Sequence, residues 1–234
     1  MSRLRSFAAS ARQARLAYAV ALWLVPAIAD AQPYRGNTGP SAGSFEIGGG
    51  VVWNGGYDAG SRAATESPNS STGGSPITLF TTDSKVAPVL GVEGRAGIYL
   101  GSRVSAEGTF QYSRPVLRTT IGSDFENAES TEATETVSSY LVTGSLVYHF
   151  GSGRVVPFLR GGGGYLRQLH EDNAELLTGY EFHGGGGMKF WFGTGGGRFG
   201  VRVDAGVSSR SKSVAFEQKR RILPVAGAGI VYLF

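Results

Sequence analysis

The most constraining stretch of this sequence is its last one, residues 223–234, LPVAGAGIVYLF. Every second residue counted back from Phe234 is apolar, and the chain stops on that aromatic residue without a polar tail. A period of two is typical of a β-strand, whose alternate side chains point to opposite faces of a sheet. The stretch therefore predicts a strand with one continuously apolar face, which belongs either in the core of a soluble sheet or against lipid.

Seven further segments alternate in the same way, with apolar residues on one face and polar or charged residues on the other. They are residues 44–53, 88–100, 103–113, 136–150, 155–167, 179–192 and 198–209. Phe158 breaks the pattern of its segment. Glycine, at 37 of 234 residues, falls inside these runs without a Gly-X-Y period, which excludes a collagen-like chain. With the terminal stretch there are eight strands, and an even number suits an all-β, up-and-down antiparallel barrel.

The connections between these segments alternate strictly between long and short. The long ones are residues 54–87, 114–135, 168–178 and 210–222, and the short ones are residues 101–102, 151–154 and 193–197. Long loops on one side and short turns on the other are the known asymmetry of transmembrane β-barrels. This pattern favours the lipid-facing interpretation of the apolar faces.

The N-terminal residues have the organisation of a secretory signal peptide. Residues 1–31 contain four arginines, then an apolar run over 16–28, then Ala29-Asp30-Ala31 as a small-residue cleavage site. Residues 32–43 are predicted to be a short arm, and residues 44–234 the barrel. After the leader no segment approaches the length of a transmembrane helix, so membrane insertion would have to use strands. The leader's four arginines and one aspartate account for three of the chain's four net positive charges, which leaves +1 and no reason to expect nucleic acid as a partner.

Aromatic residues on the apolar faces gather at two levels, near the short turns and near the long loops. The predicted girdles consist of Phe45, Phe150, Phe190, Phe192, Phe199, Tyr232 and Phe234 at the first level, and Trp53, Phe110, Tyr112, Tyr140, Tyr165, Tyr180 and Phe182 at the second. Between them lie mostly glycine, alanine, valine, leucine and isoleucine. Aromatic rings are favoured at lipid headgroups, where one side of the ring is apolar and the other is wet.

Taken together, the leader, the eight strands, the loop alternation, the girdles and Phe234 resemble the small OmpA/OmpX-type outer-membrane β-barrel family. The resemblance covers residues 44–234 and is architectural. It implies a monomeric porin-family barrel in the outer membrane of a Gram-negative bacterium, surrounded by outer-membrane lipid and lipopolysaccharide. It also implies that the C-terminal strand is recognised by the barrel-assembly machinery. It does not imply one biochemical activity.

The polar faces of the strands carry a balanced set of charges that would point into the barrel. The predicted lumen network consists of Glu46, Glu93, Glu107 and Asp204 with Arg95, Arg160, Lys189 and Arg202. An eight-stranded barrel encloses only enough space for side chains, and buried charges must pair to offset their desolvation. We therefore predict a closed, charge-paired lumen and a structural or surface-interaction role; the alternative is a narrow porin-like channel. Inward glycines would make room for the long Arg and Lys stems, whereas the register gives no such reason for outward Gly161, Gly163, Gly184 and Gly186.

The sequence offers little catalytic chemistry. There are no cysteines, and no serine, histidine and acid set with shared geometry is evident around His149, His170 or His183. We predict no enzyme activity, no cofactor and no metal. Two alternatives remain open: an outer-leaflet lipid-modifying enzyme, and a secreted lipocalin-like ligand-binding barrel with its apolar face inside.

Two of the long loops carry opposite charges. The second contains Asp124, Glu126, Glu129, Glu132 and Glu135, and the fourth contains Arg210, Lys212, Lys219, Arg220 and Arg221. One hypothesis is a charged external patch that binds lipopolysaccharide phosphates or a surface partner. The other is that these are solvated loop tips, as most charge runs are.

Overall fold

The computed structural model describes residues 40–66, 77–122, 129–170, 176–192, 198–211 and 220–234. The predicted signal peptide and residues 32–39 of the predicted arm lie outside them. No helix among the described residues is long and apolar enough to cross a membrane. These residues form eleven strands: β1 (Phe45–Asn54), β2 (Tyr57–Glu66), β3 (Ile77–Val86), β4 (Val89–Tyr99), β5 (Val104–Ser113), β6 (Val116–Gly122), β7 (Thr131–His149), β8 (Val155–His170), β9 (Leu176–Phe192), β10 (Arg198–Ser211) and β11 (Arg221–Leu233).

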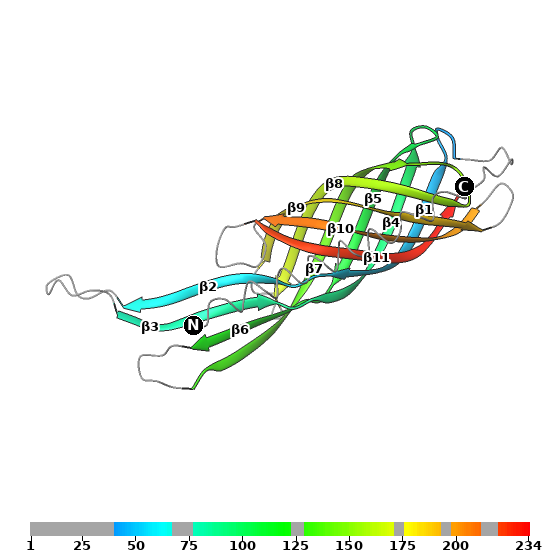
Figure 1. The fold of residues 1–234 in the computed structure, drawn as a ribbon. Helices are drawn as coiled ribbons and strands as arrows, with labels where there is room; N and C mark the ends of the chain where they lie inside the picture. The colour runs from blue at the N-terminus through cyan, green and yellow to red at the C-terminus, as the bar shows by residue number, and fades with distance from the viewer. Residues whose placement is uncertain (1–39, 67–76, 123–128, 171–175, 193–197, 212–219) are drawn as a thin grey trace, which may run out of the picture. The chain divides into compact units, whose positions relative to one another are not determined.

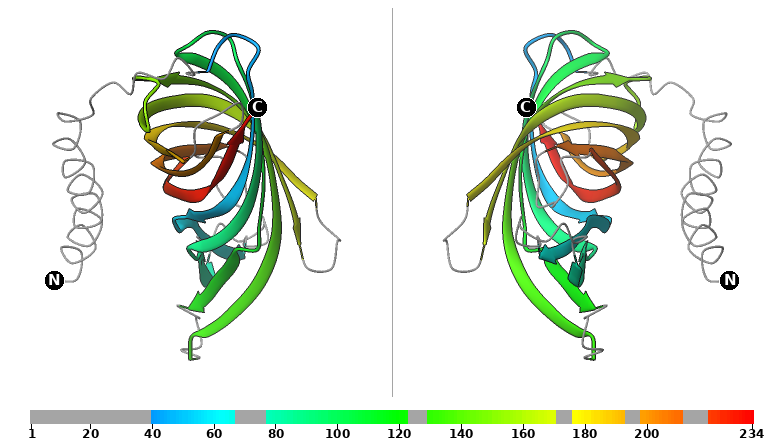
Figure 2. Two further views of the ribbon diagram at one scale, coloured as in Figure 1. Left: turned by 90° about the vertical axis from the view of Figure 1, so that its right-hand side faces the viewer. Right: turned by 90° about the vertical axis from the view of Figure 1, so that its left-hand side faces the viewer.

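Eight of these strands close into an antiparallel barrel, as the sequence predicts. Around the ring they are β1, β4, β5, β7, β8, β9, β10 and β11, and the β7–β8 pairing closes the sheet on itself (Figures 1 and 2). The last and first strands meet in register along β1 and β11, and the Phe234 amide donates to the Phe45 carbonyl at 2.8 Å. The terminal apolar stretch therefore forms the seam of the barrel.

A second sheet grows out of the long-loop end of the barrel. Strand β2 pairs with β3, β3 pairs with β6, and β6 pairs with residues 131–136 of β7, which then continues into the barrel wall (Figure 1). The prediction that residues 54–87 and 114–135 are loops is thus wrong for most of their described length. These hairpins are rich in Thr, Ser and Ala and leave both faces largely exposed, so they lack the apolar–polar contrast that marks the barrel strands.

A small apolar core holds the base of the second sheet. It contains buried Ala59, Val86, Leu117 and Val137, and Tyr57 packs against it. Farther from the barrel the sheet has no comparable core among the described residues. We refer to this side of the barrel as the long-hairpin end and to the other as the short-turn end.

The glycines in the runs of β8 and β9 point alternately inward and outward, as predicted. The inward ones were predicted to make room for long Arg and Lys side chains, and their surroundings indicate a different role. A Cβ at inward Gly162 would meet the carbonyl oxygen of Gly144 on β7 and lie 2.7 Å from Ser145 Cα. Inward glycines such as this allow neighbouring backbones to approach closely. Space for buried side chains is the better explanation at Gly227, where a Cβ would lie 3.5 Å from Glu93 Oε1.

Two of the outward glycines also gain an explanation. A Cβ at Gly163 would lie 3.0 Å from Cδ1 of Phe182, and one at Gly186 would lie 3.0 Å from Cδ2 of Leu159. Each glycine is therefore covered by a large side chain from the neighbouring strand, an arrangement that protects a glycine in a sheet. No such cover is found over Gly161 and Gly184.

Candidate functional site: the barrel lumen

The two faces of the barrel wall have opposite chemistry. The outer face exposes large apolar side chains, among them Leu90 at 70% and Ile222 at 72%. The inner face buries charged groups, with Arg202 and Lys189 each at 1%. A soluble ligand-binding barrel has the reverse arrangement, so the lipocalin-like alternative is wrong.

All fourteen predicted girdle residues lie on the outer face, exposed or half-buried. Several form ring contacts across strand boundaries at both ends of the barrel. Phe45–Phe234 centroids are 6.0 Å apart, Tyr112–Tyr140 5.1 Å, Tyr165–Tyr180 6.2 Å and Phe192–Phe199 6.5 Å. Tyr148, which the girdle prediction omitted, joins this surface through an edge contact with Phe150 at 5.1 Å.

Arg202 is the centre of the charge network in the lumen. Its Nη1 donates to Glu107 Oε2 at 2.5 Å, and its Nε donates to Asp204 Oδ1 at 3.2 Å. Asp204 also forms ion pairs with two further arginines. Arg160 Nη2 lies 2.7 Å from its Oδ2, and Arg95 Nη1 lies 3.4 Å from its Oδ1. Arg95 is paired as well with Glu93. One aspartate thus joins three arginines from three strands, β4, β8 and β10.

At the short-turn end a lysine, a carboxylate and aromatic rings lie together inside the barrel. Lys189 Nζ lies 2.7 Å from both oxygens of Glu46, and the Tyr99 hydroxyl donates to the same carboxylate at 3.0 Å. The ammonium is 5.7 Å from the Tyr99 ring centre and 5.9 Å from that of Trp191. Buried Val156, Val231 and Leu233 complete this cluster. All of these side chains are buried inside the barrel.

Phe158, which broke the sequence pattern, belongs to the same group of buried side chains, since Lys189 Nζ lies 5.8 Å from its ring centre. Its side chain points inward and is buried, and the Arg202 guanidinium lies 4.4 Å from its ring centre. A guanidinium over an aromatic face is attracted by the ring quadrupole, most strongly where water is excluded. The exception to the alternation therefore places an aromatic surface beside the central cation.

The long-hairpin end holds a further bridge that the sequence analysis missed. Arg210 Nε donates to Glu181 Oε2 at 2.6 Å, and its Nη2 donates to Asn54 Oδ1 at 3.0 Å. Arg210 is buried in β10, so its prediction as part of a basic loop is wrong. Extending the period of two from Arg202 and Asp204 by three more steps would have placed it inside the barrel.

The other charged loop residues are spread over several places. Glu132 and Glu135 lie on β7 and Arg221 lies on β11, where it donates to the Ala59 carbonyl at 3.2 Å. Glu129 and Arg220 are exposed next to strands. The remaining four, Asp124, Glu126, Lys212 and Lys219, lie outside the described residues.

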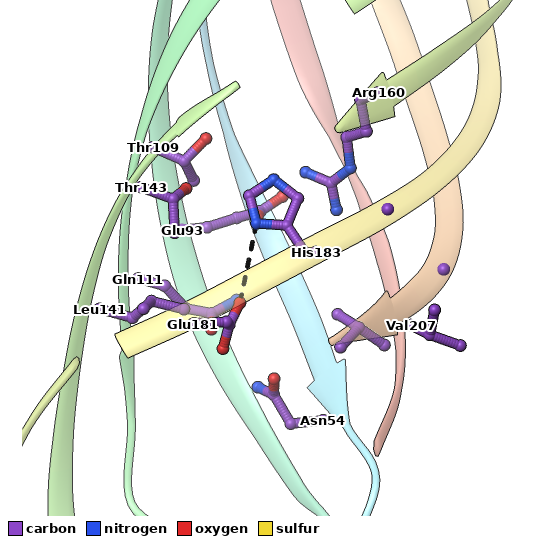
Figure 3. Close-up of a pocket in the computed structure, with 13 residues that line it drawn as sticks. Asn54, Glu93, Thr109, Gln111, Leu141, Thr143, Arg160, Glu181, His183 and Val207 are labelled. Carbon is purple, nitrogen blue, oxygen red and sulfur yellow. Dashed lines mark ion pairs between the residues drawn. The ribbon is translucent and has the colours of Figure 1, made fainter. Parts of the chain in front are cut away.

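A small polar cavity of about 30 Å³ lies between the ion-pair network around Arg202 and the Arg210–Glu181 bridge (Figure 3). Asn54 and Glu181 line it on the side of the Arg210 bridge, and Glu93 and Arg160 line the opposite side. Asn54 Nδ2 and Thr109 Oγ1 are buried there without a hydrogen-bond partner among the described residues. The volume is enough for about two water molecules, which would satisfy such groups.

Two serine–histidine contacts occur in the lumen, which the sequence did not predict. Ser145 Oγ lies 2.8 Å from His183 Nε2. Glu181 Oε1 lies 3.9 Å from His183 Nδ1 (Figure 3). Ser105 Oγ lies 3.0 Å from His149 Nε2. Ser145 is not part of the cavity lining and the carboxylate is beyond hydrogen-bond reach of the ring, so the geometry is that of polar groups satisfying one another. His170 is at the end of β8.

Among the described residues, no cluster of three or more potential metal ligands is found. Comparison with known proteins gives a likeness of fold. The structure matches the outer membrane protein OprG from Pseudomonas aeruginosa with a TM-score of 0.50 and 14% sequence identity. The match covers 84% of this chain and 98% of that chain. The chain therefore has the fold of a small outer-membrane β-barrel. No family model and no curated protein matches the sequence.

Proposed function

We propose that this protein is a monomeric integral barrel of the bacterial outer membrane, with a closed lumen and a structural or surface-interaction role. The observation that carries the proposal is the inverted wall, apolar outside and charged inside. A closed barrel satisfies every backbone group within its ring of strands, which lipid requires and water does not. A continuous exposed apolar belt of this kind would be an aggregation hazard in water.

The orientation follows from the lengths of the connections. In outer-membrane barrels the short turns face the periplasm and the long segments face outward. The short-turn end, with Phe45 and Phe234, would then face the periplasm. Strands β2, β3, β6 and the first residues of β7 would stand outside the cell, which supports a role in contact with surface partners. The outer-membrane lipids and the assembly machinery expected from the sequence are part of this proposal. So is the OmpA/OmpX-type assignment, which rests on strand count, loop alternation and Phe234.

The first test is the mobility of the detergent-extracted protein in SDS gels, boiled against unboiled, together with cell fractionation. We expect a heat-dependent shift and recovery in the outer-membrane fraction, because a closed barrel with buried ion pairs resists SDS until heated. A periplasmic protein without a shift would contradict the proposal.

The alternative, a narrow porin-like channel, would conduct ions, whereas a closed lumen would not. With the Arg202 layer across the middle and the Lys189 cluster at the short-turn end, we expect the wild-type protein to give no conductance steps in planar lipid bilayers. Glu46→Gln, which removes the negative charge that pairs with Lys189 at that end, is the companion variant. A porin in the same bilayer is the positive control. Steps in the wild type that change in Glu46→Gln would establish a pore along this axis.

We propose no enzymatic activity. A lipid-modifying enzyme of the outer leaflet needs its nucleophile and base where acyl chains can reach them. Ser145 and His183 lie inside the lumen, and the cavity beside His183 has room for about two waters.

A further inference from the structure

One charged side chain lies on the outer face of the barrel wall. Within the barrel-paired parts of the eight described strands, the residues that point outward are apolar, aromatic, glycine or hydroxyl-bearing, except Arg167 on β8. Resting on the proposed function, we propose that Arg167 and the tyrosines around it bind a phosphate group of lipopolysaccharide in the outer leaflet.

The position of Arg167 suits a headgroup contact. It lies three residues before the end of β8 at the long-hairpin end, in register with Tyr140 on β7 and Thr178 on β9. Its side chain is exposed and makes no hydrogen bond or ion pair with any residue that the structure describes. An arginine is costly among acyl chains, whereas near the interface its apolar stem lies along the wall while the guanidinium reaches the headgroups.

The surroundings of Arg167 offer hydrogen-bond donors. Tyr140 contacts Tyr112 at 5.1 Å between ring centres, and Tyr165, two residues before Arg167 on the same face, contacts Tyr180 at 6.2 Å. None of these four phenol groups has a hydrogen bond within the described part of the chain.

The chemistry of this patch selects an anion. Guanidinium groups donate two parallel hydrogen bonds to phosphate oxygens, and phenol hydroxyls can donate to the same group. Within the described barrel strands, carboxylates are confined to the inner face, so nothing there competes for Arg167. Of the two phosphate-bearing lipids of an outer membrane, lipopolysaccharide occupies the outer leaflet, and Arg167 is at the end that faces outward. We therefore assign lipopolysaccharide, not phospholipid, as the ligand.

The test is native mass spectrometry of the full-length barrel in a non-ionic detergent. It is titrated separately with diphosphorylated lipid A, dephosphorylated lipid A and phosphatidylglycerol. We expect the wild type to bind diphosphorylated lipid A about tenfold more tightly than either other lipid, the size expected for one charge-assisted contact. Arg167→Gln should lose this preference, and Arg167→Lys should keep part of it. The matched control is Arg118→Gln, an exposed arginine on β6 outside the barrel wall, which should bind as the wild type does.

Two results would overturn the inference. One is unchanged lipid A binding in Arg167→Gln, and the other is equal binding of phosphatidylglycerol, which would make a phospholipid the ligand. The heat shift in SDS gels separates this inference from the proposed function. A protein that lacks the shift contradicts the membrane barrel itself, whereas a shifting barrel with unchanged lipid A binding in Arg167→Gln contradicts only the phosphate site.

Discussion

Replacing Arg202 by methionine is expected to lower the free energy of unfolding by about 3–5 kcal/mol, the range for breaking a buried ion pair by removing one partner. The side chain is 1% exposed and donates to both Glu107 and Asp204. Methionine fills similar space but leaves Glu107 without its only cation within hydrogen-bond distance among the described residues. Asp204 keeps Arg95 and Arg160. The loss comes chiefly from one uncompensated carboxylate in a site that water does not reach.

The measurement is urea-induced unfolding in detergent, followed by the heat-modifiable band and by tryptophan fluorescence. The control is Arg118→Met, since Arg118 lies 3.7 Å from Glu132 and both side chains are more than half exposed. We expect that exposed pair to contribute less than about 1 kcal/mol. The double variant Arg202→Met with Glu107→Gln should recover part of the loss, because the orphaned charge is gone. Equal destabilisation by Arg202→Met and Arg118→Met would show that burial of the network does not stabilise the barrel.

The barrel strands could be predicted because lipid and lumen impose opposite demands on alternate residues. Each wall strand must present apolar side chains outward and polar or small ones inward, and that contrast is visible in a single sequence. Strands β2, β3 and β6 meet no such demand, since both of their faces are largely exposed beyond the small core of Ala59, Val86, Leu117 and Val137. Their alternation of threonine, serine and alanine could not be told from loop composition.

The members of the lumen network were predictable as a group, but their partners were not. Parity along a strand says that Arg160 and Asp204 point inward. Their 2.7 Å contact depends on how β8 and β10 are staggered around the barrel, which alternation does not reveal. The inward position of Phe158 could not be explained from the sequence for the same reason. Its explanation is the Arg202 guanidinium, which lies 4.4 Å from the ring centre and comes from a different strand. Arg210 was missed for a simpler reason: its predicted strand ended at Ser209, whereas β10 continues to Ser211. Glu181 lay inside the predicted strand 179–192 but was left out of the network, because its partner Arg210 had been placed in a loop.

Gly162→Ala is expected to destabilise the barrel by about 3 kcal/mol, at the upper end of the usual cost of overpacking a filled interior. The added Cβ would meet the carbonyl oxygen of Gly144 and lie 2.7 Å from Ser145 Cα. Both atoms belong to the backbone of β7, so no side-chain rotation can relieve the contact. Strands β7 and β8 would have to move apart, at the expense of their ladder of hydrogen bonds and of the Ser145–His183 contact that spans Gly162.

The matched control is the preceding residue, Gly161, on the opposite face of the same strand. A Cβ there would meet only the His183 carbonyl oxygen, at an ordinary 3.9 Å. Because glycine within a strand is less stable than alanine by roughly 0.5–1 kcal/mol, Gly161→Ala should leave the barrel as stable or slightly more so. Urea midpoints of the two variants should therefore move in opposite directions. If Gly162→Ala unfolds at the wild-type midpoint, β7 and β8 do not approach as closely as described, and the inward glycines serve side-chain space after all.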